Sequence, residues 1–211
     1  MKHFLSILLF STLLILNTEA RTAEEWKSRS VYQIITDRFA KSDGDATPCN
    51  DLYRYCGGTF KGILNNLDYI QGMGFDAIWI SPVVENTDGG YHGYWAKNLY
   101  KINENFGTAE ELKELIRTCH SRDIWVMIDV VANHMGYTDN GDYSSIIPFN
   151  DIKYYNPYRH CDEIDFNHQP DVETCWLNGL PDLDQSNPEV KSLLIEWGKD
   201  FVKTYDVGAL R

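Results

Sequence analysis

Short apolar runs alternate with amphipathic segments along most of the chain, and this order constrains the fold more than any other feature. Each run is rich in β-branched or aromatic residues, which predicts a strand. Apolar strands that alternate with helices predict a parallel sheet covered by helices. The expected strands are residues 31–39, 77–84, 124–132 and 206–211.

Helices are expected between these strands. Apolar residues recur at helical spacing over residues 60–70. Thr108 and Glu111 have the spacing of a capping box, which predicts that a helix begins there. Ser186 and Glu189 repeat this spacing ahead of the third amphipathic segment.

Two architectures fit this pattern, an open doubly wound sheet and a closed barrel. No glycine-rich phosphate-binding turn follows the first strand, and the long polar loops follow strands while the loops that enter strands are short. Both observations favour the barrel, whose sites lie at the carboxyl ends of the strands. A complete barrel takes about 250 residues. We therefore expect an α/β fold, the N-terminal half of a (β/α)8 TIM barrel that ends in its fourth strand.

One connection is too long to be a simple loop. Between the third strand and the third helix lie about fifty residues, rich in Tyr, Asn, Asp and Pro. We expect residues 134–184 to form a small irregular domain inserted after strand three. The barrel would then comprise residues 21–133 and 185–211.

The N-terminus has the pattern of a secretory signal peptide. A basic start precedes an apolar run that is too short to span a bilayer, and small residues follow it. We expect residues 1–20 to be removed and the protein to be secreted. The formal net charge of −12 argues against nucleic acid or anionic lipid as a partner.

Five cysteines occur in the chain. In an oxidising compartment, loop length favours the pairs Cys49 with Cys56 and Cys161 with Cys175. Cys119 is left over and continues an apolar helical stripe, which indicates a buried thiol. A reactive or intermolecular cysteine is the alternative.

Polar residues at the ends of the inserted segment suggest a metal site. Asn133 follows the third strand, and Asp182 lies at the far end of the segment. A carboxamide oxygen, a carboxylate and main-chain carbonyls are suitable ligands for Ca²⁺. An ion held from both ends would fix the segment against the barrel. The alternative for Asn133 is a turn residue at the end of the strand.

Aromatic residues follow the second strand in the sequence YHGYW, which contains His92, Tyr94 and Trp95. Aromatic faces stack on sugar rings, and polar tips bind hydroxyl groups. His134, at the end of the third strand, would lie on the same face and could contact the same ligand. The alternatives are an aromatic cluster that holds the loop and a structural histidine.

Arg211 is at the end of the fourth strand, where a guanidinium needs an acceptor. Asp129 on the neighbouring strand is the natural partner. An arginine beside a catalytic carboxylate would also keep that acid ionised.

Taken in order, several segments resemble landmarks of the α-amylases, and most closely of the secreted Taka-amylase-like (fungal-type) enzymes. The likeness covers essentially all of the chain after residue 20. The segments are TDRFA at residues 36–40, CGGTFKGILNNLDYIQGMGFDAIWISPV at 56–83, YHGYW at 91–95, DVVANHMGY at 129–137, LPDLD at 180–184 and GALR at 208–211.

The resemblance implies roles for individual residues. Asn133 and Asp182 match ligands of a structural calcium ion, and Glu173 matches a residue that contributes a main-chain carbonyl to it. The four cysteines paired above fall where this group has its first two disulfides. The residues that match the lining of the sugar subsite at the cleavage point are His92, Tyr94, Trp95 and His134; Arg211 matches an arginine that lies two positions before the nucleophilic aspartate.

The resemblance also implies an activity, the endo-hydrolysis of α-1,4-glucosidic bonds in starch or glycogen with retention of configuration. The expected partner is an α-glucan, and the full-length enzyme is expected to be a monomer. The nucleophile and the general acid match positions after Arg211, so a polypeptide of these 211 residues is expected to be inactive by itself. The alternatives are a related α-glucosidase or transglycosylase, and a non-catalytic sugar-binding secreted protein.

Overall fold

The computed structural model describes residues 21–211, so the expected signal peptide at residues 1–20 lies outside the described residues. The central sheet has four parallel strands. Because their order in the sheet is their order in the chain, the described sheet lacks the order reversal of a doubly wound fold and forms part of a barrel wall, as expected. The order is β1 (Val31–Ile34), β2 (Ala77–Ile80), β5 (Trp125–Ile128) and β6 (Ala209–Leu210).

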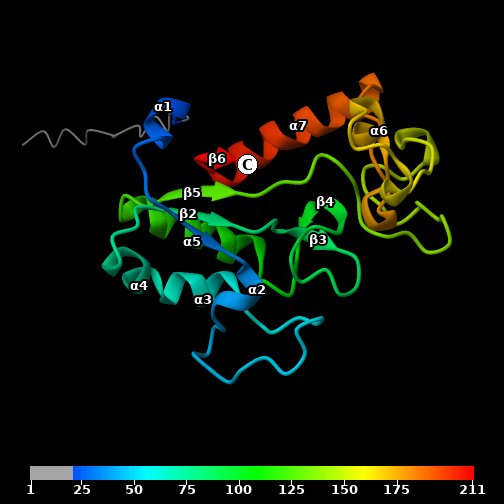
Figure 1. Cartoon of the computed structure of the whole chain (residues 1–211). Coiled ribbons are helices and arrows are strands. Elements are labelled where there is room, and N and C mark those ends of the chain that lie inside the picture. The colour runs from blue at the N-terminus through cyan, green and yellow to red at the C-terminus, as the bar shows by residue number, and fades with distance from the viewer. Residues whose placement is uncertain (1–20) are drawn as a thin grey trace, which may run out of the picture.

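Helices connect successive strands of this sheet (Figure 1). Helix α5 packs against both α3 and α7, so the helices form a continuous outer layer. The sheet does not close on itself within residues 21–211. The connecting helices are α3 (Phe60–Asn65), α4 (Leu67–Gly72), α5 (Ala109–Ser121) and α7 (Pro188–Tyr205).

Smaller elements surround this framework. The strands β3 and β4 form an antiparallel hairpin after β2, where the sequence predicted only a loop. The hairpin and the long segment between β5 and α7 lie toward the carboxyl ends of the parallel strands (Figure 1). These elements are α1 (Ala23–Trp26), α2 (Thr36–Phe39), β3 (Val84–Asn86), β4 (Ala96–Ile102), η1 (Ile152–Tyr154), η2 (Cys161–Glu163), α6 (Gln169–Thr174) and η3 (Leu177–Gly179).

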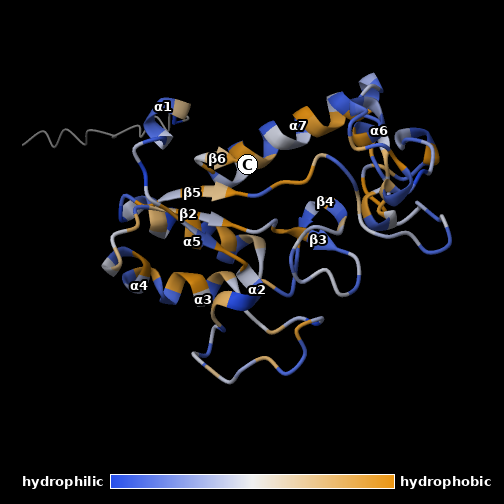
Figure 2. Cartoon of the chain, viewed as in Figure 1, coloured by the Kyte–Doolittle hydropathy of each residue, from blue (hydrophilic) through white to orange (hydrophobic). Residues whose placement is uncertain are grey.

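The hydrophobic core lies between the sheet and the helices, where Figure 2 shows the apolar stripes. Helix α5 buries Leu112, Leu115, Ile116 and Cys119, the stripe that its spacing predicts. Each large apolar side chain buried in this way contributes about 1.5–3 kcal/mol. Burial raises the pKa of the Cys119 thiol to about 12, which makes it unreactive at neutral pH.

The capping box at the start of α5 is present. The Thr108 hydroxyl accepts from Glu111 N, and the Glu111 carboxylate accepts from Thr108 N at 2.7 Å. The predicted cap at Ser186 is wrong. Asn187 caps α7 instead, and its Oδ1 accepts from Glu189 N at 2.9 Å. Pro188 takes the first helical position, so the residue just before it becomes the cap.

The strands are shorter than predicted at their carboxyl ends. The predicted strand 31–39 ends at Ile34, and α2 begins two residues later. The cause is a side-chain contact, because Thr36 N donates to Ser81 Oγ at 3.0 Å instead of extending the ladder. Apolar residues 35 and 39 prolong the pattern beyond the real strand.

The structure forms both expected disulfides, Cys49–Cys56 and Cys161–Cys175. Cys119 is the one cysteine without a partner in the described part of the chain. Among residues 21–211, no helix is both long and apolar enough to cross a membrane.

The double variant Cys49→Ser/Cys56→Ser is expected to lower the free energy of unfolding by about 2–3 kcal/mol, because the bond closes a loop of about eight residues in the unfolded chain. Denaturant titration of the protein and the variant measures this difference. In reductant the two midpoints should coincide. Equal midpoints under oxidising conditions would contradict the expectation.

Candidate functional site

Polar side chains follow each strand of the parallel sheet at its carboxyl end. Thr36 and Asp37 follow β1, Ser81 follows β2, Asp129 follows β5 and Arg211 follows β6. The first four are buried. Buried polar groups cost free energy unless they are hydrogen-bonded, so this edge of the sheet must be organised around polar contacts.

Asp129 is the centre of one group of contacts. The Tyr94 hydroxyl donates to Asp129 Oδ2 at 2.6 Å, and Arg211 Nη1 lies 3.6 Å from Asp129 Oδ1. The Arg211 guanidinium also lies over the Trp79 ring, 4.8 Å from its centroid. Asp129 Oδ1 has no hydrogen-bond partner among residues 21–211. The predicted pairing of Arg211 with Asp129 is therefore present as an ion pair, and one buried acceptor remains available.

The YHGYW loop forms a cluster of rings. His92 stacks on Tyr94 with centroids 5.7 Å apart, and its ring meets Trp95 edge-on at 4.8 Å. Gly93 has φ of +88°, and a Cβ there would lie 2.3 Å from Pro82 O, so only glycine fits. The loop is thus held closely against the end of β2.

His134 connects this loop to β5. It is 8% exposed, and its Nε2 lies 3.0 Å from Tyr94 O while its Nδ1 lies 3.2 Å from Asn133 Nδ2. A carbonyl can only accept, so Nε2 carries the proton and Nδ1 accepts from the amide. Both ring nitrogens are engaged within the protein. A sugar hydroxyl at Nε2 would have to compete with the Tyr94 carbonyl.

Burial controls the ionisation of these groups. It lowers the pKa of His92, with further contributions from Arg38 and His134, and it lowers the pKa of His134. Burial and the hydrogen bond to Asp129 raise the pKa of Tyr94 to about 12. Near pH 7 both imidazoles are neutral and the Tyr94 hydroxyl keeps its proton.

We expect His92 to titrate below its ordinary pKa of 6.5. Because the unfolded chain then binds this proton at higher pH than the folded chain, the stability that His92 contributes is present above pH 6.5 and is lost as pH falls through the folded pKa. NMR of labelled histidine over pH 4–8 measures it. Arg38→Gln should raise the His92 pKa because a nearby positive charge is removed, whereas Arg54→Gln should leave it unchanged. A titration midpoint of His92 at or above 6.5 would contradict this.

Asn133 and Asp182 meet although they are far apart in the chain. Asn133 Nδ2 donates to Asp182 Oδ1 at 3.1 Å, and Asn156 Nδ2 donates to Asp182 Oδ2 at 2.8 Å. Backbone bonds run alongside, from Met135 N to Pro181 O and from Leu183 N to Asn133 O. The two ends of the segment 134–184 are therefore fastened together at the carboxyl end of β5.

The chemistry of this cluster fits a hard cation only in part. Asp182 is 1% exposed, and burial raises its pKa to about 6 although both amides donate to it. A cation beside the carboxylate would reverse that shift. Within residues 21–211, no group of three or more His, Cys, Asp or Glu residues is arranged to hold a metal. The Glu173 carboxylate is exposed and accepts from Gln169, without a hydrogen bond to the cluster.

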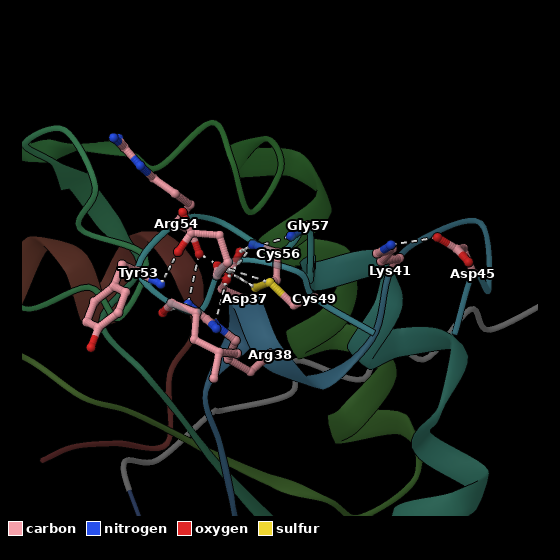
Figure 3. The surroundings of a disulfide bond; sticks show 11 residues. Asp37, Arg38, Lys41, Asp45, Cys49, Tyr53, Arg54, Cys56 and Gly57 are labelled. Atoms are coloured by element: carbon pink, nitrogen blue, oxygen red, sulfur yellow. Dashed lines mark hydrogen bonds and ion pairs between the residues drawn. A yellow bond between two sulfur atoms is a disulfide. The ribbon is translucent and has the colours of Figure 1, made fainter. Parts of the chain in front are cut away.

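A third buried carboxylate, Asp37, was not predicted from the sequence. Its oxygens accept from Cys56 N at 2.8 and 3.0 Å and from Gly57 N at 3.1 Å, and Arg38 Nε lies 2.9 Å away (Figure 3). These contacts fasten the loop of the Cys49–Cys56 disulfide to the end of β1. The signal in the sequence was an Asp-Arg pair that interrupts the apolar run predicted as the strand 31–39.

The parallel sheet with its outer helices, and the polar side chains at the carboxyl ends of its strands, define the class of protein. Both are typical of a (β/α)8-barrel protein, whose functional side chains lie at the carboxyl ends of the strands.

Comparison with known proteins identifies the family. Residues 33–211 match the model of the α-amylase catalytic domain. The chain is 47% identical over 222 residues to an α-amylase of Saccharomycopsis fibuligera, and 49% identical over 206 residues to α-amylase 1 of Schwanniomyces occidentalis. These alignments cover 98% and 90% of this chain. The chain therefore belongs to the α-amylase catalytic-domain family.

Solved structures of α-amylases support the same family assignment. An α-amylase from Malbranchea cinnamomea superposes with a TM-score of 0.86 at 44% identity and covers 90% of this chain. An α-amylase from Geobacillus thermoleovorans in complex with acarbose gives 0.78 at 40% identity and covers 88%. The chain spans less than half the length of these relatives, 44% and 40% of the two curated proteins and 43% and 40% of the two structures.

Proposed function

We propose that the whole protein hydrolyses internal α-1,4-glucosidic bonds of starch and glycogen with retention of configuration. The observation that carries this proposal is the contact network at the carboxyl ends of the strands, which joins Tyr94, His134, Asp129 and Arg211. A relative of 40% identity has been solved in complex with acarbose, which supports a sugar-like ligand on this fold.

The chain supplies binding and positioning groups for this reaction. His92 and Trp95 offer ring faces and edges to a pyranose. The Tyr94 ring stacks on His92, and its hydroxyl donates a hydrogen bond to Asp129. Arg211 would hold a carboxylate two residues further along in its charged form. His134 would act mainly by fixing the position of Tyr94.

Retaining cleavage requires two carboxyl groups about 5 Å apart, one that attacks and one that protonates the leaving oxygen. The resemblance to α-amylases assigns both to positions after Arg211. A polypeptide limited to these 211 residues is therefore expected to show no turnover. Tyr94 and Arg211 can orient a sugar and a carboxylate but cannot replace the nucleophile.

We also propose that Ca²⁺ binds at Asn133 and Asp182 and fixes the segment 134–184 as a lobe above the barrel. Rotation of the Asn133 carboxamide would turn Oδ1 toward the ion, and the Asp182 carboxylate would supply the charge. The main-chain carbonyl of Glu173 is the third proposed ligand. The ion would have a structural role, because it would hold together the two ends of the segment 134–184, which already lie side by side.

Secretion, with removal of residues 1–20, and action as a monomer complete the proposal. The test is to incubate the whole protein with maltoheptaose and follow the products by proton NMR. The α-anomer should appear first, from internal cleavage. A β-anomer would exclude retention, glucose released only from the chain end would indicate an α-glucosidase, and cyclic products would indicate a transglycosylase.

A further inference from the structure

Arg38 lies in the short helix α2, directly after β1, and its guanidinium is largely enclosed by protein. The side chain is 20% exposed, and its Nε lies 2.9 Å from Asp37 Oδ2. Asp37 is itself buried and accepts hydrogen bonds from the backbone of Cys56 and Gly57. An enclosed charge is stable only when it is paired and hydrogen-bonded. The carboxylate of Asp37 therefore fixes the Nε end of the guanidinium.

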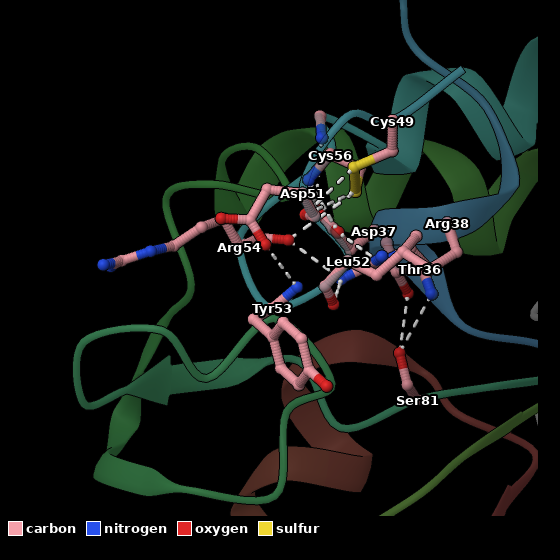
Figure 4. Close-up of polar contacts among 11 residues, drawn as sticks. Thr36, Asp37, Arg38, Cys49, Asp51, Leu52, Tyr53, Arg54, Cys56 and Ser81 are labelled. Carbon is pink, nitrogen blue, oxygen red and sulfur yellow. Dashed lines mark hydrogen bonds and ion pairs between the residues drawn. A yellow bond between two sulfur atoms is a disulfide. The ribbon is translucent and has the colours of Figure 1, made fainter.

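Main-chain carbonyl groups fix the other end of the guanidinium. Arg38 Nη2 donates to Leu52 O at 2.9 Å and to Arg54 O at 2.8 Å (Figure 4). Both carbonyls belong to the loop that the Cys49–Cys56 disulfide closes. Hydrogen bonds from a charged donor are stronger than those between neutral groups. The planar group is therefore held at both ends, and its plane is fixed.

The flat face of the guanidinium contacts an aromatic ring. Arg38 Cζ lies 3.8 Å from the centroid of the Tyr91 ring. The cation is attracted to the face of the ring at this distance. Tyr91 meets the His92 ring edge-on with centroids 4.9 Å apart, and His92 stacks on Tyr94. Arg38 is thus the first member of a chain of contacts that ends in the candidate site.

The charge of Arg38 also acts on the same group. Burial lowers the pKa of His92, and the positive charge of Arg38 lowers it further. Arg38 therefore joins three parts of the chain, which are the end of β1, the disulfide loop and the YHGYW loop. A binding ring is effective only when the residues behind it hold it in place.

We propose that Arg38 is a positioning residue of the sugar site. Its guanidinium fixes the Tyr91 ring, and through that ring the His92 imidazole, without contacting the sugar itself. This inference rests on the proposed function and adds a residue that determines how well the YHGYW loop binds a glucosyl unit.

The test measures kcat and KM of the whole protein on maltoheptaose, with the variants Arg38→Met, Tyr91→Leu and the double variant. Each single variant should raise KM about tenfold, the effect of losing one partly buried cation–π contact, and should leave kcat within about twofold. The double variant should be no worse than either single variant, because both changes break the same contact. Tyr91→Phe keeps the ring and should behave as the unsubstituted protein.

The matched control is Arg54→Met, which removes an arginine side chain from the disulfide loop but keeps the carbonyl that Arg38 binds. That side chain is 66% exposed, and neither constant should change. A merely structural role of Arg38 would lower kcat through loss of folded protein and leave KM unchanged. That result, or additive effects in the double variant, would overturn the proposal.

The same measurements separate this proposal from the proposed function. If the unsubstituted protein does not cleave maltoheptaose, the proposed function fails. Cleavage of maltoheptaose with an unchanged KM in Arg38→Met contradicts only the positioning role of Arg38.

Discussion

Replacing Arg211 by alanine is expected to lower kcat of the whole protein about 100- to 1000-fold, the usual cost of removing one preorganised charged group from an active site. Arg211 lies between the Asp129 carboxylate and the Trp79 ring. Its backbone is fixed by bonds to Ile128 O and from Val130 N. Without the guanidinium, Asp129, which accepts from the Tyr94 hydroxyl, loses the cation that faces it.

Initial rates on soluble starch measure the effect. Arg211→Lys should recover only part of the activity, because an ammonium lacks the planar fork of donors. Arg117→Ala, at an exposed position of α5, is the matched control and should retain full activity. Activity of Arg211→Ala within about threefold of the unsubstituted protein would remove Arg211 from the proposed site.

Replacing Asp182 by alanine is expected to lower the free energy of unfolding by about 1–3 kcal/mol, because the half-buried amide of Asn156 and the exposed amide of Asn133 lose their acceptor. It should also abolish the stabilisation by added Ca²⁺. Asp182→Asn keeps one acceptor and should cost less without calcium, yet it should lose the calcium response as well. Thermal unfolding in calcium and in chelator measures both effects.

The matched control is Asp162→Ala, in the same segment, where the side chain is 87% exposed. It should keep the full calcium response and nearly full stability. A calcium response that survives in Asp182→Ala would show that the ion binds elsewhere. An unchanged midpoint in chelator would show that the amides find other partners.

Features set by neighbouring residues could be predicted from the sequence. The capping box of Thr108 and Glu111 and the buried stripe of α5 are local patterns, and both are present. The alternation of strands and helices predicted a barrel wall, and the strand order agrees. The N-cap of α7 was misplaced by one residue, because Ser186 and Asn187 are both good caps and the choice depended on Pro188.

Features set by tertiary contacts could not be predicted in the same way. Strand β1 ends earlier than predicted because Thr36 N donates a hydrogen bond to Ser81, 45 residues away. The contacts of Asp37 and Arg38 were not predicted either. They depend on backbone groups of the loop closed by the Cys49–Cys56 disulfide, which the fold brings against the end of β1. The hairpin of β3 and β4 was not predicted, because its connection is rich in glycine and was interpreted as a loop.

In the candidate site, too, some contacts could be predicted from the sequence and others could not. Asn133 and Asp182 could be paired because both lie where the inserted segment joins the barrel, and the structure brings them together. That His92, Tyr94 and His134 share one face followed from strand ends meeting at one edge. The engagement of both His134 nitrogens did not follow, because it depends on where the Tyr94 carbonyl lies.

The proposed sugar site is tested most directly by a crystal structure of the whole protein with a bound maltooligosaccharide. A glucosyl ring should lie against His92, Tyr94 and Trp95, within reach of the end of β6 at Arg211. Sugar density confined to another face, with this edge of the barrel filled only by solvent, would contradict the proposed sugar site.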